Sequence, residues 1–475
     1  MKKADVSTPS PRVEYLEGQR ALCRTIMGGT FAMREAGQKY LPKHPAESDG
    51  VYKTRLEKTF LDNFVSQAID KATGKLFAKQ IKVDDVPSDI ETLLENIDRQ
   101  GRALDPFMMD VAKQAFTDGI SFVMADMPPS DGIRTLAEEK QAGIRPYALH
   151  VKPQDILETV SEMIGGVETL TRVRIREVVQ KPDGWDYVTI EQIRVWYREV
   201  VKDENGNDKV LVRWELYRQG EKKEWVMVQE GATTFKGIYL VPFYTNRVGF
   251  MEGLPPFQNT AESNLEHWQW KSEHAHALSM QCFGMLTAVG VSEESEIQIG
   301  PAKVLRSSSP EAKFAYTETT GTGVTLAADA LKAIEARIES AGVNLRVENA
   351  GQVTATAAAL DSEEANAALK AVAGGFSDSI ELLFQYFAEM LNLDAGNAGT
   401  AVVSDDFGTK KGTDAGLQEI TKGRALGDIS REGWLDVLRW RGELPEEFDA
   451  EEDAERLQAE GPPLSSVAVD QSTGV

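Results

Sequence analysis

Residues 147–245 alternate apolar and polar side chains with a period of two, whereas the segments on both sides do not. The stretch TRVRIREVV sets Val173 and Ile175 between arginines. The stretch KVLVRWELYR repeats the pattern at Val210, Val212, Trp214 and Leu216. Because successive side chains of a strand point to opposite faces, this spacing indicates half-buried strands. The segment is therefore predicted to be an antiparallel module of five or six strands.

Two dipeptides in this module, Asp183-Gly184 and Asn205-Gly206, are typical of hairpin turns. A row of basic side chains also runs through it, at Arg172, Arg174 and Arg176. The row could bind phosphate. Acidic residues are mixed in nearby, at Glu177, Glu191 and Glu199, so a solvated sheet face is the favoured interpretation.

The residues before the module show helical spacing. We expect one helix over 52–80 and a second over 88–100, with Ser88 as N-cap and Glu91 completing a capping box. A third helix should start near Asp105-Pro106. The N-terminal stretch MKKADVSTPSPRVEYLEG has no apolar segment of the kind found in secretory signals, and its Ser, Thr and Pro content predicts a loose arm.

Helical spacing returns after the module. Residues 257–284 are predicted to form one long helix with only a weak apolar stripe, which would be stable beside copies of itself. A narrow apolar stripe follows, at Ala327, Leu331, Ile334, Ile338, Ala341 and Leu345. Gly374-Gly375 should kink or interrupt a later helix, and 414–442 hold further helix. Helical and alternating segments together predict an α+β fold.

Composition limits the function. The chain has 475 residues, of which 41% are hydrophobic and 27% charged, so it can bury a core. No apolar run is long enough to predict a membrane-spanning helix. The net charge of −23 argues against a protein that grips nucleic acid, but not against one that DNA slides past. The two cysteines, Cys23 and Cys282, lie far apart in the sequence, so a reduced cytoplasmic setting is favoured over a disulfide between them. The sequence has no CxxC motif, which excludes a thiolate zinc site.

Three of the five histidines lie in HWQWKSEHAHAL, residues 267–278. On a helix His267 and His274 are ~10.5 Å apart along the axis, too far for two ligands of one zinc ion. His276 faces roughly the opposite side from His274. The HExxH spacing is absent. These histidines are therefore predicted to be structural, and no metal or cofactor is expected.

The sequence also lacks a GxSxG nucleophile elbow and a P-loop. The TGTGVTLAAD segment lacks the third glycine and the preceding strand of a dinucleotide fingerprint. The acidic pairs Asp84-Asp85 and Asp405-Asp406 lie in polar segments, where neighbouring carboxylates do not converge. We therefore expect no catalytic residues and no enzyme.

Four stretches in order give the chain a likeness to a known family. They are YLPKHPAESDGVYKTRLEKTFLDNF, YTNRVGFMEGLPPFQNTAESNLEHW, GVNLRVENAGQVTATAAALDSEEANAALKAV and GDISREGWLDVLRWRGELPEEFDAEEDAERL. With them the chain resembles portal proteins of tailed bacteriophages, in the group whose portal domain has no named function. The stretches span most of the chain, and none is a catalytic motif.

The resemblance implies a head-to-tail connector, a ring of twelve chains at one capsid vertex of the virion, assembled in the host cytoplasm. It implies a division of the chain into 1–256 as wing with the N-terminal arm, 257–284 as first stem helix, 285–325 as clip, 326–346 as second stem helix, 347–353 as tunnel loop, 354–404 as kinked wing helix, 405–460 as crown and 461–475 as disordered tail. A clip of 41 residues is short for the family.

The resemblance also implies partners and site residues. Double-stranded DNA would pass without sequence specificity, and the expected proteins are the terminase large subunit, the major capsid protein, scaffold, and head-completion or tail adaptor proteins, with no membrane. The residues expected to face DNA are Arg346, Glu348, Asn349 and Gln352. The residues expected to pack the ring are Leu265, Trp268, Leu331, Ile334 and Ile338. The clip residues expected to dock the motor or adaptor are Glu293, Glu294, Lys303 and Arg306.

Two other classes stay open. One is a structural head or tail adaptor protein that is not the portal, against which a helix pair flanking a small mixed insert argues. The other is a soluble enzyme of unrecognised family, against which the absence of catalytic motifs argues. The mass of the assembly in solution separates a twelve-chain ring from a monomer or dimer.

Overall fold

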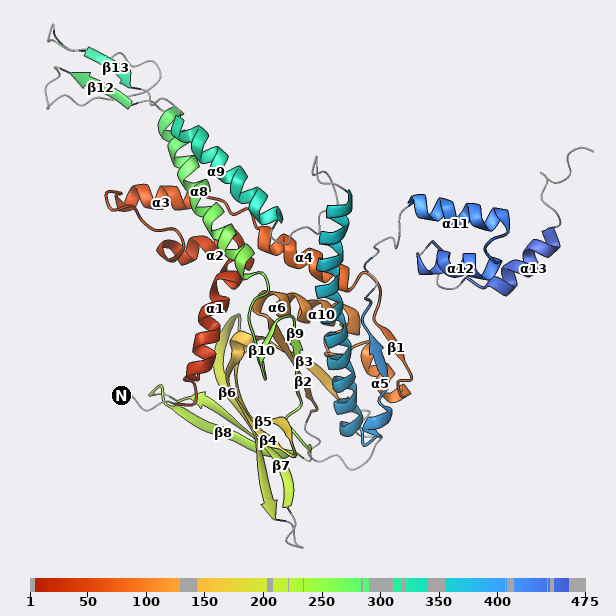
Figure 1. Ribbon diagram of the computed structural model, residues 1–475. Helices are drawn as coiled ribbons and strands as arrows, with labels where there is room; N and C mark the ends of the chain where they lie inside the picture. The colour runs from red at the N-terminus through yellow and green to blue at the C-terminus, as the bar shows by residue number, and fades with distance from the viewer. Residues whose placement is uncertain are drawn as a thin grey trace, which may run out of the picture. The chain divides into compact units, whose positions relative to one another are not determined.

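The computed structural model describes residues 5–128, 143–202, 208–220, 222–233, 235–282, 285–289, 311, 313–317, 322–340, 355–405, 407, 414–441, 443–444 and 448–460. The chain divides into two compact units, Met1–Asp405 and Asp406–Val475. The first unit contains both helices and antiparallel sheets, so the predicted α+β class is confirmed (Figure 1). No helix in the described part of the chain is both long and apolar enough to span a membrane.

The N-terminal helices are α1 (Pro11–Met27), α2 (Gly29–Ala36), α3 (Asp49–Lys58), α4 (Phe64–Leu76), α5 (Ser88–Leu94) and α6 (Leu104–Asp118). The prediction of a loose arm is wrong from Pro11 onward. Ser10 caps α1 by accepting a hydrogen bond from the Val13 amide, and proline occupies the first helical position. The Ser10 amide also donates to the Leu157 carbonyl at 2.9 Å, which ties the segment to the β module.

The single helix predicted over 52–80 is two helices, α3 and α4. The chain is extended at Thr59, and the Asn63 side chain caps α4 by accepting from the Ser66 amide at 2.9 Å. The second helix, predicted over 88–100, is shorter in the structure: α5 ends at Leu94. Its N-cap is Pro87, so the Ser88 capping box does not form.

The predicted β module belongs to two sheets. Five strands form an antiparallel meander in the order β4 (Ile156–Ile164), β5 (Val167–Asp183), β6 (Asp186–Lys202), β7 (Asp208–Gln219) and β8 (Trp225–Thr233). The outer ends of the module, β3 (Tyr147–Val151) and β9 (Leu240–Tyr244), instead flank β2 (Ile120–Asp126). Residues 120–125 of β2 are all buried, which is why this strand shows no alternation in the sequence.

The alternation of apolar and polar residues correctly predicts the buried side chains of the five-stranded meander. Val173 and Ile175 are buried in the core with Val212, while Leu157, Ile193 and Val195 form a smaller cluster. The predicted turn at Asp183-Gly184 is confirmed, since Asp183 pairs with Asp186. Asn205-Gly206 lies outside the described residues. The prediction of a solvated arginine row holds only in part. Arg172 and Arg174 both pair with Glu158, but the Arg172 side chain is 49% exposed and the Arg174 side chain only 14%.

The remaining strands of the first unit are β1 (Lys82–Asp84), paired with β14 (Thr400–Val402), β10 (Arg247–Gly249), paired with β11 (Glu252–Gly253), and β12 (Met285–Val289), paired with β13 (Lys313–Thr317). Its later helices are α8 (Gln258–Cys282), α9 (Thr322–Ser340) and α10 (Ala355–Met390). Helix α10 runs without interruption through Gly374-Gly375. It packs on β9 through a Phe376–Phe243 contact at 5.2 Å, so packing on the sheet holds the helix together across the glycine pair.

The second unit contains α11 (Asp414–Leu426), α12 (Arg431–Trp440) and α13 (Ala450–Glu460). Helix is therefore present over much of 414–442, as predicted, but in two pieces. Gly427 adopts a positive φ of 87° after α11, and the Ser430 side chain caps α12 by accepting from the Gly433 amide. The predicted disordered tail, 461–475, lies outside the described residues.

Candidate functional site

Helices α8 and α9 lie side by side and antiparallel (Figure 1). Strand β12 starts three residues after α8 ends, and β13 ends five residues before α9 begins. These strands pair from Met285↔Thr317 to Val289↔Lys313. The chain therefore leaves the α+β body along one helix, forms a two-stranded ladder and returns along the other.

The apolar contact of the pair lies at the α9 end nearest the body. Ile334 and Ile338 are buried with Ala68 of α4, and Phe64 and Phe257 pack against them. Of the residues predicted to pack a ring, Trp268 is also fully buried, while Leu265 and Leu331 are half-buried. Burial of Ile334, Ile338 and Trp268 thus occurs within one chain and needs no neighbour.

The buried face of α8 is largely polar. Asn264, which is fully buried, accepts hydrogen bonds from the Phe64 and Val65 amides at 3.0 and 3.4 Å and donates to the Asp62 carbonyl at 2.8 Å. These amides belong to the first turn of α4 and have no partner inside that helix. The sequence predicts that α8 is stable when packed beside copies of itself, and that packing stays a prediction. Within the chain, several polar groups of α8 already have hydrogen-bond partners.

His267 is a structural histidine within this face. Its side chain is 2% exposed, and its Nε2 lies 3.0 Å from Glu335 Oε1 of α9. Its ring packs edge-on against Phe64 with centroids 5.2 Å apart. His274 and His276 are half-buried farther along α8. Among the described residues, no group of three His, Cys, Asp or Glu side chains is placed to hold a metal ion.

Purified full-length protein is expected to contain no stoichiometric transition metal, as measured by elemental analysis. The double substitution His267→Ala and His274→Ala should lower the free energy of unfolding by about 1–3 kcal/mol, mainly because His267 is buried. Glu335 is 46% exposed, so water can solvate it after the change. One zinc ion per chain, lost in the double variant, would contradict this assignment.

A buried ion-pair cluster joins α3 to α8. The Arg55 side chain is 2% exposed and donates to both carboxylate oxygens of Glu47 at 2.9 and 2.8 Å. It also donates to Ser272 Oγ and to Glu273 Oε1, both at 3.3 Å, and to the Pro42 carbonyl at 2.9 Å. The hydrogen bond from Arg55 lowers the pKa of Glu47 to about 2. The guanidinium therefore fixes α3 and the preceding loop against α8.

The cluster predicts a pH dependence of stability. Because the folded-state pKa of Glu47 is lowered from 4.5 to about 2, its stabilisation is present above about pH 4.5 and is lost as the pH falls toward 2. Glu47→Gln should cost about 1–2 kcal/mol of unfolding free energy at pH 7 and progressively less below pH 4.5. Denaturant titrations at several pH values measure the difference. Glu57→Gln, at a 64% exposed side chain, is the matched control and should show neither effect.

The other predicted site residues belong to the expected tunnel loop and clip. The tunnel-loop residues Arg346, Glu348, Asn349 and Gln352 lie outside the described residues, as do the clip residues Glu293, Glu294, Lys303 and Arg306. The described parts of the predicted clip include β12 and β13. The assigned roles of all eight residues remain predictions.

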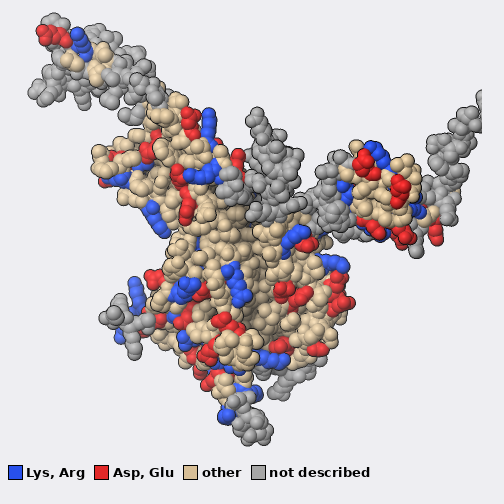
Figure 2. Space-filling view, in the orientation of Figure 1, with Lys and Arg blue, Asp and Glu red and all other residues tan. Residues whose placement is uncertain are grey.

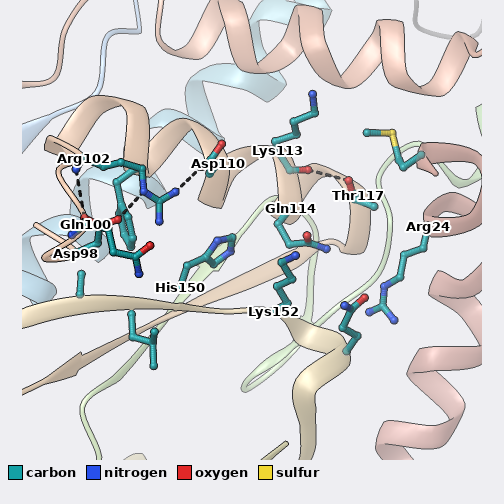
Figure 3. A pocket seen from close by; sticks show the side chains of 15 residues that line it. Arg24, Asp98, Gln100, Arg102, Asp110, Lys113, Gln114, Thr117, His150 and Lys152 are labelled. Atoms are coloured by element: carbon teal, nitrogen blue, oxygen red, sulfur yellow. Dashed lines mark hydrogen bonds and ion pairs between the residues drawn. The ribbon is translucent and has the colours of Figure 1, made fainter. Parts of the chain in front are cut away.

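A pocket of about 570 Å³ opens between α6 and the β3 edge of the first unit (Figure 3). It is lined by many charged side chains, but most of its cations are paired. Arg102 binds Asp98 and Asp110 at 2.5 and 2.6 Å, and Lys113 binds Asp70 at 2.6 Å. The pocket therefore largely neutralises itself and offers little free charge to an anionic ligand.

One wall of this pocket holds a serine–histidine contact that no motif in the sequence indicates. His150 Nε2 lies 2.8 Å from Ser121 Oγ. The two residues are diagonal neighbours on β3 and β2, because His150 pairs with Val123. Burial lowers the pKa of His150 to about 4, so the ring is neutral at pH 7. Ser121 is fully buried, however, and cannot reach a substrate in the pocket. The contact therefore links strands β2 and β3 and is not a nucleophile–base pair.

Charges of both signs are interspersed on the face of the protein shown in Figure 2. Ion pairs also join separate elements of the first unit. Arg12 of α1 binds Glu252 of β11 at 2.6 Å, and Lys271 of α8 binds Asp62 at 2.5 Å. Among the described residues visible on this face, lysine and arginine form no continuous basic patch of the kind that grips nucleic acid.

Comparison with known proteins gives a partial family match. Residues 256–391, from just before α8 to just after α10, match the family model described as Domain of unknown function (DUF4055). The match covers less than a third of the chain. A search of curated proteins finds no match.

Solved structures of gene transfer agent (GTA) particles contain similar chains. One, in the neck of an empty GTA particle computed with C6 symmetry, has a TM-score of 0.37 and 11% identity, covering 79% of this chain and 89% of that one. A second, in the virion of a native GTA particle, has a TM-score of 0.39 and 10% identity, covering 87% of this chain and 98% of that one. A third, in the neck of a native GTA particle computed with C12 symmetry, has a TM-score of 0.37 and 10% identity, covering 80% of this chain and 90% of that one. All three TM-scores are too low to establish a shared fold.

Proposed function

We propose that this chain is the subunit of a tailed-phage portal, a ring of twelve copies at one capsid vertex. Double-stranded DNA passes through the ring during packaging and ejection. The ring is also the docking platform for the terminase and later for head-completion and tail proteins. The observation that carries the proposal is the antiparallel α8–α9 pair with the β12–β13 ladder between the two helices. The resemblance to portal proteins implies this arrangement, with two stem helices on either side of a clip.

The element bounds support this assignment of parts. The expected first stem helix, 257–284, corresponds to α8, and the second, 326–346, overlaps α9. Helix α9 begins at Thr322, so the clip of this proposal runs from 283 to 321 and is even shorter than expected. The expected crown, 405–460, corresponds to the second compact unit without its tail. In this proposal the wing is formed by the α+β body up to β11.

The charge of the chain suits a channel that DNA does not adhere to. Each chain carries a net charge of −23. A DNA backbone is held by clustered lysine and arginine, and a negative wall repels it. The proposed tunnel loop offers one basic and one acidic residue together with amides, which allows contact without a fixed register. The proposed activity is mechanical passage and needs no catalytic residue.

The first test is the mass of the purified full-length chain in solution, together with negative-stain images. The proposal expects closed rings of twelve chains. A monomer or dimer at all accessible concentrations would contradict it. Rings that assemble onto preformed portal vertices, rather than into new capsids, would identify the chain as a head or tail adaptor instead.

The second test targets the proposed tunnel loop. Replacing 348–352 with a short glycine bridge should leave rings that form and enter capsids, but DNA packaging, retention or ejection should fail. The same bridge in place of 203–207, between β6 and β7, is the matched control and should leave infectivity unchanged. Normal titres from the 348–352 variant would remove this loop from the mechanism.

A further inference from the structure

The β5–β6 hairpin extends beyond the sheet that contains it. Pairing of β4 with β5 ends at Ile156↔Ile175, and pairing of β6 with β7 ends at Gln192↔Arg218. Residues 176–191 therefore continue as a two-stranded ribbon, on the order of 25 Å long at the usual strand rise. Nearly all residues from 178 to 191 are exposed. An isolated two-stranded ribbon has marginal stability in water, so its length needs a reason.

The turn at the end of the ribbon presents a tryptophan. Asp183 pairs with Asp186, which leaves Gly184 and Trp185 as a two-residue loop. Gly184 has a φ of 65°, as the first central position of a type II′ turn requires. The Trp185 side chain is fully exposed, at 105%, and Tyr187 next to the turn is 64% exposed. Indole side chains carry a large share of binding energy when they fill a pocket at an interface.

The same chain offers a groove that suits an indole, between α3 and α8. It encloses about 420 Å³, well above the ~150 Å³ cavity that holds benzene in an engineered protein. Its surface is mostly apolar, and its walls are mainly small side chains, among them Gly50, Val51, Thr54, Ala275 and Ser279. The buried Arg55 side chain of α3 donates hydrogen bonds to α8 and so holds the two helices together. The groove is therefore a formed feature of the first unit.

Charge at the tip complements charge at the groove. Asp183 and Asp186 flank Trp185, and neither forms an ion pair with a described residue. Lys58, at the edge of the groove, is exposed and likewise has no ion pair in the described part of the chain. Arg55, the other cation of the groove, is already bound to Glu47. Lys58 is thus available to an acidic tip.

We propose that Trp185 of one copy inserts into the α3–α8 groove of a second copy, with Asp183 or Asp186 beside Lys58. The contact joins two different surfaces, so it is a head-to-tail contact that closes into a ring or continues as a filament. The inference rests on the proposed function in so far as it names one contact that holds the proposed ring together.

The test measures assembly of full-length variants by mass photometry across a concentration series. Trp185→Ala should weaken association by about 30-fold or more, the effect of an interface hot spot. Phe31→Ala, at a 79% exposed side chain on α2, is the matched control and should assemble as the wild type does. Because Trp185 contacts solvent, the variant should keep the wild-type circular dichroism spectrum and melting temperature.

A charge exchange tests the partner surface independently of the indole. Lys58→Glu alone and the pair Asp183→Lys with Asp186→Lys alone should each weaken association, and the two combined should restore it in part. Wild-type association of Trp185→Ala, or no recovery in the combined variant, would overturn the contact. If Trp185→Ala rings form normally but are not incorporated into particles, the tip binds another virion protein and the assignment to a second copy is wrong.

The outcomes for the contact and for the function are separable. Rings that survive both sets of changes overturn the contact and leave the portal proposal intact. Wild-type filaments or open chains that Trp185→Ala dissolves support the contact and contradict the portal. A wild-type chain that stays monomeric contradicts both.

Discussion

Replacing Ile334 by aspartate is expected to abolish the stable folded form of the α8–α9 pair. Ile334 is 4% exposed and lies with Ile338 and Ala68 in a cluster that Phe64 and Phe257 cover. A carboxylate there has no cation beside it in this cluster and must be buried without a partner or expose the cluster to water. The cost is about 3–5 kcal/mol, a large part of the stability of a typical domain.

The expected result of Ile334→Asp is insoluble protein or a soluble chain that forms no rings, measured by soluble yield, thermal melting and negative-stain images. Leu326→Asp provides the control, because residue 326 is on the same helix with its side chain 65% exposed. It adds the same charge to α9 and should change the melting temperature little. A normal melting temperature for Ile334→Asp would show that the described packing of α9 on α4 is wrong.

Replacing Arg55 by methionine is expected to detach α3 from α8. The change leaves the Glu47 carboxylate, at 5% side-chain exposure, without its cation. It also removes the bonds to Ser272 and to the Pro42 carbonyl. Removing one partner of a buried ion pair costs roughly 3 kcal/mol. Amide hydrogen exchange over 41–58 should accelerate, and the denaturation midpoint should fall.

Two comparisons make the Arg55→Met result specific. Arg12→Met removes a 2.6 Å ion pair with Glu252 in which the arginine side chain is 54% exposed, and it should lower the denaturation midpoint much less than Arg55→Met does, because water screens the pair. Adding Glu47→Met to Arg55→Met removes the uncompensated carboxylate and should recover part of the lost stability. Equal losses for Arg12→Met and Arg55→Met would contradict a stabilising role that depends on burial.

The α3–α8 groove depends on the same cluster, which links these predictions to the proposed Trp185 contact. Arg55 fixes the distance between the two helices whose small residues line the groove. Arg55→Met should therefore weaken association of copies as well as stability. Trp185→Ala should weaken association alone. The two variants together separate damage to the groove from loss of its occupant.

Much of the local structure could be predicted from the sequence because local structure depends on residues close in the chain. The period-two alternation around Val173 and Ile175 identified a strand with one buried face, and Asp183-Gly184 identified the turn that ends it. Helical spacing identified α8 as one long helix and placed α9 to within a few residues. The α+β class follows from these two periods alone.

Element ends and strand partners were predicted less well, because they depend on distant residues. The split between α3 and α4 occurs where the Asn63 side chain caps α4. Asn264, 200 residues after Phe64, accepts from amides of the first turn of α4 that have no partner inside that helix. The segment 147–245 contributes to two sheets because its outer strands, β3 and β9, pair with β2. Strand β2 is buried on both faces, so its sequence lacks the alternation of apolar and polar residues that identifies the other strands.

The sequence by itself determined the class of the fold, the long helix α8 and the hairpin turn at Asp183-Gly184. Only the tertiary structure decided why α8 is polar. Its polar groups meet Asp62, Arg55 and Glu335, which lie 68 to 217 residues away in the chain. A periodic pattern reports which face of a helix is buried but not what covers it. Buried polar groups depend on that partner, because an unpaired one costs more free energy than its hydrogen bond contributes.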